Sequence, residues 1–334
     1  MRNLSKYLRI VFSVILIYVI LTKVNLGEVI ALFHQITLHY LVPILLFFVF
    51  EKVVEAYKWN LLLRAKHIYI PFMEMFKITY IGSFLGFALP SAISVDLIRG
   101  YGLYKHLSGR EESISSVIVD RVLSLSVLTT LAIVSIILSS IYTTIDKDII
   151  RSILLLLGVF LILWILLVVV ALVKQNTIWE IIENRFRKLK TNVIWIKVKK
   201  LHRSLQEYKV HQLTLLKVGA LSVAINVSRI LLFYLVSLCL SLKIPLVYFL
   251  VFIPAIQLIT RLPISIGGIG VREGGFVYFF SKVGFPYSQT FAIPFLVSIL
   301  VILSILPGGI IYATAGFSSH RDQVSHPAQD GVPK

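Results

Sequence analysis

Apolar residues form long, nearly uninterrupted runs along this chain, separated by shorter polar stretches. A helix needs about 20 apolar residues to cross the hydrocarbon core of a bilayer, and several runs reach or approach that length. The runs predicted as membrane segments are 8–24, 40–54, 72–89, 116–141, 149–173, 213–240, 245–259 and 289–312. The pattern predicts an all-α, polytopic membrane helix bundle with about eight membrane segments.

Composition supports a membrane environment. Hydrophobic residues make up 57% of the chain and the mean hydropathy is +0.89, whereas soluble domains are about 45–50% apolar. A soluble protein with an unusually large core is the alternative, but lipid accounts for the excess more simply. The basic stretch before the first run resembles a signal peptide; no small-residue cleavage site follows, so this run is predicted to be a retained first span.

The chain is strongly basic, with 33 Lys and Arg against 16 Asp and Glu and a formal charge of +17. Such a charge can indicate nucleic-acid binding, but no aromatic-rich basic module supports it, and no nucleic-acid partner is expected. It is also typical of membrane proteins, which keep Lys and Arg in cytoplasmic loops and bind anionic lipids. The region 174–217 holds 11 Lys or Arg against three Glu. It and the N-terminus are therefore predicted to be cytoplasmic, in a multi-pass protein of the plasma membrane.

The basic linker, 174–212, has a helical pattern. Its apolar positions recur at steps of four and three: Ile194, Val198, Leu201, Leu205 and Tyr208. This predicts a basic amphipathic helix on an anionic leaflet or, alternatively, a solvated helix packed on the membrane domain. Residues 1–316, linker included, are predicted to form one transmembrane domain, and 317–334 a disordered polar tail. Lys52, Lys58, Arg64 and Lys66, at and after the end of the second apolar run, are interpreted as charges at a membrane boundary.

Two stretches break the helical pattern and resemble each other. Residues 89–102 and 262–275 match at five of 14 positions, at an offset of 173 residues. Proline and clustered glycine interrupt helices, and irregular backbone in a membrane is buried in protein or lines a wet cavity. The helix-breaking residues are Pro90, Pro263, Gly267, Gly268 and Gly270. These stretches predict two re-entrant or broken helices and an internal two-fold repeat, with chance similarity of two loops as the alternative.

An arginine follows each proline by nine residues, at Arg99 and Arg272. The N-termini of half-helices attract anions, and guanidinium groups bind phosphate through two N–H groups. Charges at membrane depth usually face a partner or a polar cavity. The candidates for holding a lipid head group are Arg99, Arg229 and Arg272, the strongest, with Arg121 and Arg261. The candidate counter-charges or proton carriers are Asp96, Asp120 and Glu273. Snorkelling to the interface is the alternative for Arg121, Glu51, Glu55 and Lys77.

No catalytic constellation or nucleotide-binding motif stands out in the sequence. The single cysteine, Cys239, allows no internal disulfide and no Cys-based metal site. No enzyme activity, metal or cofactor is therefore predicted, although the absence of motifs does not exclude an embedded transferase.

The order of these motifs resembles the flippase-like membrane domain of the lysylphosphatidylglycerol synthases and the stand-alone proteins of that superfamily. The residues that carry the resemblance are 88–90, 96–101, 119–123, 262–263 and 267–274, and with the hydrophobic layout it covers most of 5–315. The resemblance implies re-entrant helices and handling of an anionic lipid, such as aminoacylated phosphatidylglycerol. Ser94 and Val95 stand where the family often has a glycine pair. The soluble aminoacyl-transferase domain of the bifunctional synthases is not expected here, nor is lysine transfer by this chain alone.

The leading hypothesis is a flippase-like transporter of an anionic phospholipid or a polyprenyl-phosphate-linked saccharide, in which loss of Arg99 or Arg272 abolishes transport. The first alternative is a membrane-embedded glycosyl- or phospholipid-transferase, which would use the carboxylates of Asp96, Asp120 and Glu273. The second is a non-transporting accessory subunit that recruits a soluble or membrane enzyme through the basic linker.

Overall fold

The computed structural model describes residues 2–87, 94–106, 112–142, 206–262, 265 and 267–316, with seven isolated positions between 151 and 203. Within these residues every regular element is a helix and there is no strand, which confirms the predicted all-α helix bundle. Most of the predicted segment 149–173, most of the linker 174–212 and the tail 317–334 lie outside the described residues.

The helices follow the apolar runs. The α-helices are α1 (Arg2–Leu21), α2 (Leu26–His34), α3 (Leu41–Arg64), α4 (Phe72–Phe87), α5 (Ser94–His106), α6 (Glu112–Tyr142), α10 (Gln212–Cys239), α11 (Leu246–Thr260), α12 (Val271–Ser281) and α13 (Tyr287–Ala315). The 3-10 helices η1 (Leu38–Tyr40) and η3 (Tyr208–Val210) precede α3 and α10. Among the described residues three helices, α6, α10 and α13, are long and apolar enough to cross a membrane, and the bent pair α1–α2 can add a fourth.

Two helices depart from the apolar pattern. The α2 helix lies in a stretch between two predicted spans; the Asn25 side chain accepts hydrogen bonds from the N–H groups of Gly27 and Glu28 and caps it. The chain bends by 85° between α1 and α2. The α3 helix continues to Arg64, well past the predicted end at 54, because the charged side chains of its second half find partners inside the protein.

The chain contains two sets of four helices in the same order of lengths. In the first set α3, α4, α5 and α6 are long, short, short and long, and α10, α11, α12 and α13 repeat that order. Adding 173 to the bounds of α4 gives 245–260, and α11 runs from Leu246 to Thr260. The same offset relates the two broken stretches, which supports the internal repeat.

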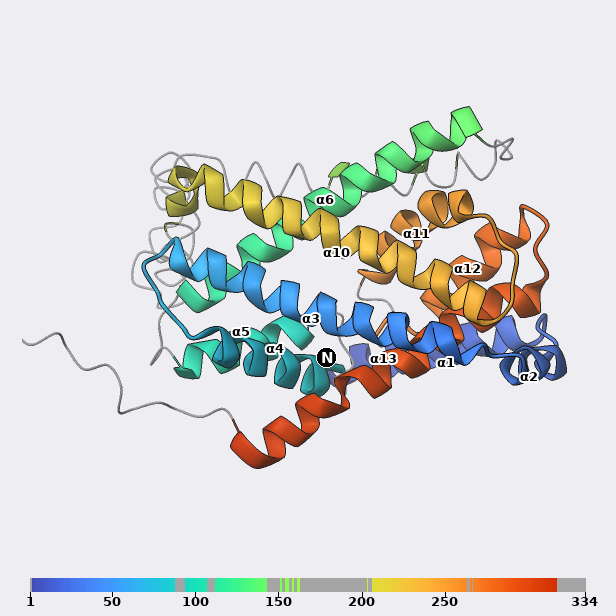
Figure 1. The fold of residues 1–334 in the computed structure, drawn as a ribbon, viewed down its shortest axis with the longest axis horizontal. Coiled ribbons are helices and arrows are strands. Elements are labelled where there is room, and N and C mark those ends of the chain that lie inside the picture. Colours follow the sequence, from blue (N-terminus) through green and yellow to red (C-terminus); the bar gives the residue numbers. More distant parts are fainter. Residues whose placement is uncertain are drawn as a thin grey trace, which may run out of the picture.

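The two sets run in opposite directions. The central helices α3 and α10 lie side by side (Figure 1) and are antiparallel. The N–H of Thr37, before α3, donates to the carbonyl of Cys239 at the end of α10 (2.9 Å), and the Tyr208 hydroxyl, before α10, donates to the carbonyl of Leu62 near the end of α3 (3.1 Å). The short helix α4 packs on α13, and α11 packs on α6. This exchange of partners is the arrangement of an inverted repeat.

Small residues stand at equivalent positions where the sets cross. A side chain at Gly308 of α13 would collide with the backbone of Tyr80 in α4. Ser135 of α6, which is 173 residues earlier, donates to the carbonyl of Leu250 in α11 (2.8 Å). Small residues allow membrane helices to approach closely, so the repeat is also visible in its contacts.

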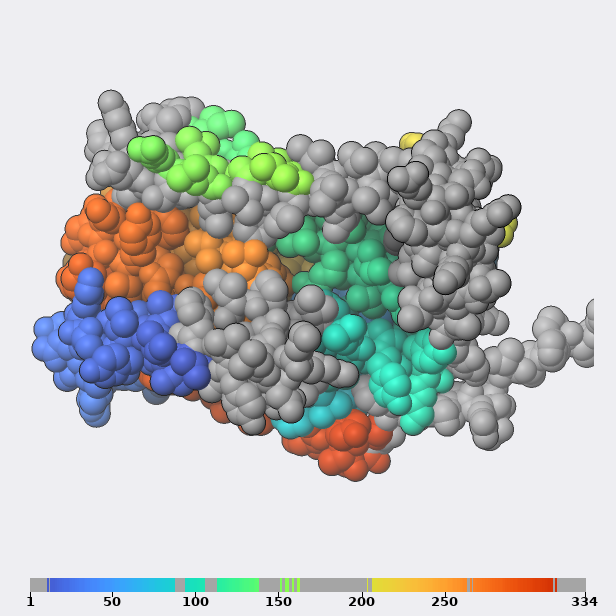
Figure 2. All heavy atoms as spheres, turned by 180° about the vertical axis from the view of Figure 1, so that it is seen from behind, coloured from blue at the N-terminus to red at the C-terminus, as the bar shows by residue number. Residues whose placement is uncertain are grey.

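Aromatic packing fixes the α11–α12 pair. Phe249, Phe252 and Phe276 surround Phe280 with ring centroids 5.1, 5.2 and 5.1 Å away, and all four are fully buried. Seen from behind, the N-terminal helices lie against the C-terminal part of the chain (Figure 2), where α1 contacts α12 and α2 contacts α13. The α11–α12 pair is therefore packed against other helices on several sides.

Candidate functional site

A cavity of about 310 Å³ lies where the two helix sets meet. Each of the eight helices of the two sets contributes to its wall. Part of the wall is apolar and consists of Phe48, Leu232, Phe233, Val297, Val301 and Ile305. The charged part consists of Glu51, Lys52, Glu55, Arg99, Arg121, Arg229, Arg261 and Arg272. All five arginines predicted from the sequence therefore line one cavity.

A smaller cavity of about 30 Å³ adjoins the same charged groups. It shares five side chains with the larger cavity: Glu55, Arg99, Arg121, Arg229 and Arg261. Its other polar lining residues are Lys58, Asp120, Ser124, Ser222 and Asn226. Its size and polarity suit bound water. The two cavities together are called the arginine cavity below.

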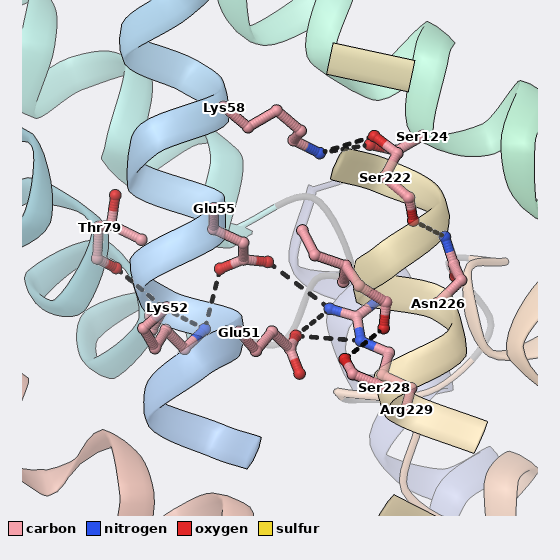
Figure 3. Close-up of polar contacts among 12 residues, drawn as sticks. Glu51, Lys52, Glu55, Lys58, Thr79, Ser124, Ser222, Asn226, Ser228 and Arg229 are labelled. Atoms are coloured by element: carbon pink, nitrogen blue, oxygen red, sulfur yellow. Dashed lines mark hydrogen bonds and ion pairs between the residues drawn. The ribbon is translucent and has the colours of Figure 1, made fainter. Parts of the chain in front are cut away.

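A charged network joins α3 to α10 across the arginine cavity (Figure 3). Glu51 and Glu55 lie one turn apart and so share a face of α3. Arg229 of α10 donates from Nε to Glu51 Oε1 (3.0 Å), and its Nη2 lies 3.5 Å from Glu55 Oε1. Lys52 completes the network, with Nζ 3.1 Å from Glu55 Oε2 and 3.0 Å from Ser83 Oγ in α4. Both glutamates thus face arginine inside the protein instead of the interface.

A second ion pair is buried deeper, between α3 and α6. Lys58 is 4% exposed. Its Nζ lies 2.9 Å from Asp120 Oδ1, and the two atoms form an ion pair without the geometry of a hydrogen bond. It donates to Ser124 Oγ (2.9 Å) and Ser222 Oγ (3.2 Å). Lys52 and Lys58, interpreted from the sequence as boundary charges, thus both lie within α3 with side chains that point into the protein.

Asp96 and Arg121 form the ion pair between α5 and α6. Asp96 lies in the first turn of α5 and is buried, where a carboxylate is favoured by the helix dipole. Asp96 and Asp120 thus both occupy counter-charge positions, one for Arg121 and one for Lys58.

The start of α12 holds Arg272 in place. Gly267, Gly268 and Gly270 adopt φ values of +59°, +78° and +82°, which glycine reaches readily, and α12 begins directly after them. Glu273 accepts a hydrogen bond from the Gly270 N–H (2.6 Å) and contacts Arg272 Nε at 3.3 Å. Arg272 Nη2 also donates to Ser298 Oγ of α13 (2.6 Å). Pro90 and Pro263 lie outside the described residues.

Arg99 is held in a different way. It is 5% exposed, and its guanidinium lies 4.5 Å from the centroid of the Trp59 ring, a cation–π contact. A side chain at Gly82 of α4 would collide with the Arg99 side chain, so glycine provides its space. Among the described residues Arg99 forms no ion pair, and its buried Nε has no hydrogen-bond partner.

Arg261, which follows the last residue of α11, lines both parts of the arginine cavity. Its side chain forms no ion pair within the part of the chain that the structure describes. Gln257, one turn earlier, also lines the larger cavity, and its Nε2 is buried without a described partner. Of the described residues, seven cations line the cavity and five of them have a carboxylate partner, which leaves Arg99 and Arg261 available for an anion.

The described residues offer no cluster of three His, Cys, Asp or Glu side chains that could hold a metal ion. The cavity-lining residues that sequence reasoning underrated are Lys52, Lys58 and Gln257. An apolar run interrupted by charges at helical spacing was the only available signal for the two lysines.

A family model described as the lysylphosphatidylglycerol synthase TM region matches residues 7–309. Comparisons with curated proteins and with solved structures find no match. The matched range includes all eight helices that line the arginine cavity apart from the last turns of α13.

Proposed function

This chain belongs to the family of lysylphosphatidylglycerol synthase transmembrane regions, and on that basis we propose that it is a flippase-like transporter of an anionic lipid. The observation that carries the proposal is a cavity with an apolar wall and two arginines, Arg99 and Arg261, that lack carboxylate partners among the described residues. Such a cavity suits an amphiphile, whose anionic head group meets the arginines and whose chains meet the apolar wall or lipid.

The helix arrangement supports a transport mechanism. The pairs α4–α5 and α11–α12 are each too short to span a bilayer as single helices and belong to oppositely directed sets. We propose that they are re-entrant hairpins entering from opposite sides. In transporters with inverted repeats, movement of one repeat against the other opens a central site to each side in turn.

The pairing of the carboxylates disfavours an embedded transferase. That alternative needs free carboxylates to hold a metal or activate a substrate. Asp96 pairs with Arg121, Asp120 with Lys58, and Glu273 with Arg272 and the Gly270 N–H. Each candidate is already neutralised by a cation, so transport is the better-supported function.

Transport can be tested in liposomes that contain the purified full chain. The probes are fluorescent phosphatidylglycerol and phosphatidic acid, with fluorescent phosphatidylcholine as the zwitterionic control. We expect protein-dependent movement of at least one anionic probe between leaflets, lost in Arg99→Gln/Arg261→Gln and retained in Lys282→Gln, which removes one exposed charge. Movement of no anionic probe, by protein shown to be folded and inserted, would refute the proposal.

A further inference from the structure

The charge balance of the arginine cavity bears on the chemistry of the head group. Seven cations line it, and five carboxylates pair with five of them: Glu55 with Lys52, Asp120 with Lys58, Asp96 with Arg121, Glu51 with Arg229, and Glu273 with Arg272. Within the part of the chain that the structure describes, two positive charges remain, on Arg99 and Arg261. We infer that the head group is a phosphate monoester instead of a phosphodiester. The inference rests on the proposed function and narrows its substrate class.

Charge matching is the first argument. A buried charge is unfavourable unless an opposite charge compensates it. A phosphate monoester carries close to two negative charges at pH 7, because its second pKa is about 6, and therefore matches both free arginines. A phosphodiester has a single ionisable group and carries one negative charge. It would leave either Arg99 or Arg261 without a counter-charge.

The donors provide the second argument. A monoester offers three unesterified oxygens, whereas a diester offers two. Arg99 and Arg261 each present a planar set of N–H donors, and the Gln257 amide adds two more, with its Nε2 buried and unpartnered among the described residues. The Arg99 guanidinium carbon lies over the Trp59 ring, and this cation–π contact leaves its N–H groups available for phosphate oxygens.

The apolar wall of the cavity indicates which group is attached to the esterified oxygen of the phosphate. Phe48, Phe233 and Val301 are among the residues that line the same cavity as the arginines. Inorganic phosphate would engage the arginines but leave this surface uncovered. A long apolar chain on the esterified oxygen would cover it, which favours a lipid monophosphate over a soluble phosphate.

Two matched amphiphiles test the inference on the purified full chain in a non-ionic detergent. Dodecyl phosphate and dodecyl methyl phosphate share one apolar chain and differ by one charge. At pH 8 we expect dodecyl phosphate to bind about tenfold more tightly or better, as measured by calorimetry. At pH 5, where dodecyl phosphate has lost its second charge, this advantage should disappear. Arg99→Gln or Arg261→Gln should also remove it, and Lys282→Gln should keep it.

The outcomes separate this inference from the proposed function. Equal affinity for the two amphiphiles, with both lost in Arg99→Gln/Arg261→Gln, would overturn the monoester and leave transport of an anionic lipid standing. Binding of neither amphiphile would overturn both. Inorganic phosphate that binds as tightly as dodecyl phosphate would replace the lipid by a soluble ligand.

Discussion

The two helix sets share a scaffold and differ in their chemistry. Arg99 of α5 and Arg272 of α12 occupy equivalent positions at the 173-residue offset. Arg272 is held by Glu273 and Ser298, whereas Arg99 lies over the Trp59 ring and has no ion pair among the described residues. Gly100 stands at the position equivalent to Glu273. The repeat thus fixes where an arginine lies, and its non-repeated neighbours decide whether the arginine is free to bind an anion.

The buried ion pair shows the same contrast. Lys58 and Asp120 form a pair between α3 and α6 in the first set. The equivalent residues of the second set are Leu231 and Ile293. The same backbone arrangement therefore holds an ion pair in one set and apolar side chains in the other. Residues of one set can thus be placed at the equivalent positions of the other to design variants.

The largest effect is expected from breaking this ion pair. Lys58→Ala leaves the Asp120 carboxylate buried without its partner and should lower the free energy of unfolding by about 3–5 kcal/mol. Lys58→Leu/Asp120→Ile, which copies the second set, should change it far less, because replacing a buried pair by apolar residues is often close to neutral. Denaturation in detergent measures both. A double variant as unstable as Lys58→Ala would contradict this reasoning.

A smaller loss is expected where α13 crosses α4. In Gly308→Ala the new methyl group meets the backbone of Tyr80, which cannot move as a side chain would. The expected loss is about 1–3 kcal/mol. Gly219→Ala in α10 is the matched control, since nothing lies within 4 Å of its added carbon, and it should be neutral or slightly stabilising. Similar unfolding curves for the two variants would disprove the close approach.

Gly82→Ala should affect Arg99 more than it affects stability. Ala255 stands at the equivalent position of the second set, so the change again copies one set into the other. The added methyl group collides with the Arg99 side chain and should displace the guanidinium, with a loss of about 1 kcal/mol in stability. Transport of anionic lipid should fall severalfold. Unchanged transport would mean that the position of Arg99 against Trp59 is not required.

The smallest effect is expected at the crossing of α6 and α11. Ser135→Ala removes one hydrogen bond to the carbonyl of Leu250 and should lower the free energy of unfolding by about 0.6 kcal/mol, typical of such bonds in membranes. A loss larger than that of Gly308→Ala would reverse the order predicted for the two crossings.

Sequence pattern located the helices well where apolar runs end at proline, glycine or a polar loop. The bounds of α4, α10, α11 and α13 all lie within a few residues of the predicted runs. The predicted second span ends at 54, ten residues before the end of α3, because charged residues such as Glu51 and Lys52 indicate the end of a span. Their partners, including Arg229, lie far away in the chain, and local pattern carries no information about them.

The same limit applies to the arginine cavity. Composition and spacing identified all five arginines, and the structure brings them to one cavity. Which of them are free was not predictable, because it depends on long-range pairing. Arg229 and Arg272 ranked with Arg99 in the sequence, but both have carboxylate partners. Arg261 ranked below them, although it forms no ion pair with any described side chain.

The central claim is that the free arginine of the first set, and not its paired counterpart in the second, binds the anionic head group. The most direct test compares the movement of fluorescent phosphatidic acid by Arg99→Gln and Arg272→Gln in the same liposomes. We expect Arg99→Gln to slow it by about tenfold or more, the loss of a charge-assisted hydrogen bond, and Arg272→Gln to slow it by no more than about threefold. Equal loss in both variants, or loss only in Arg272→Gln, would contradict the claim.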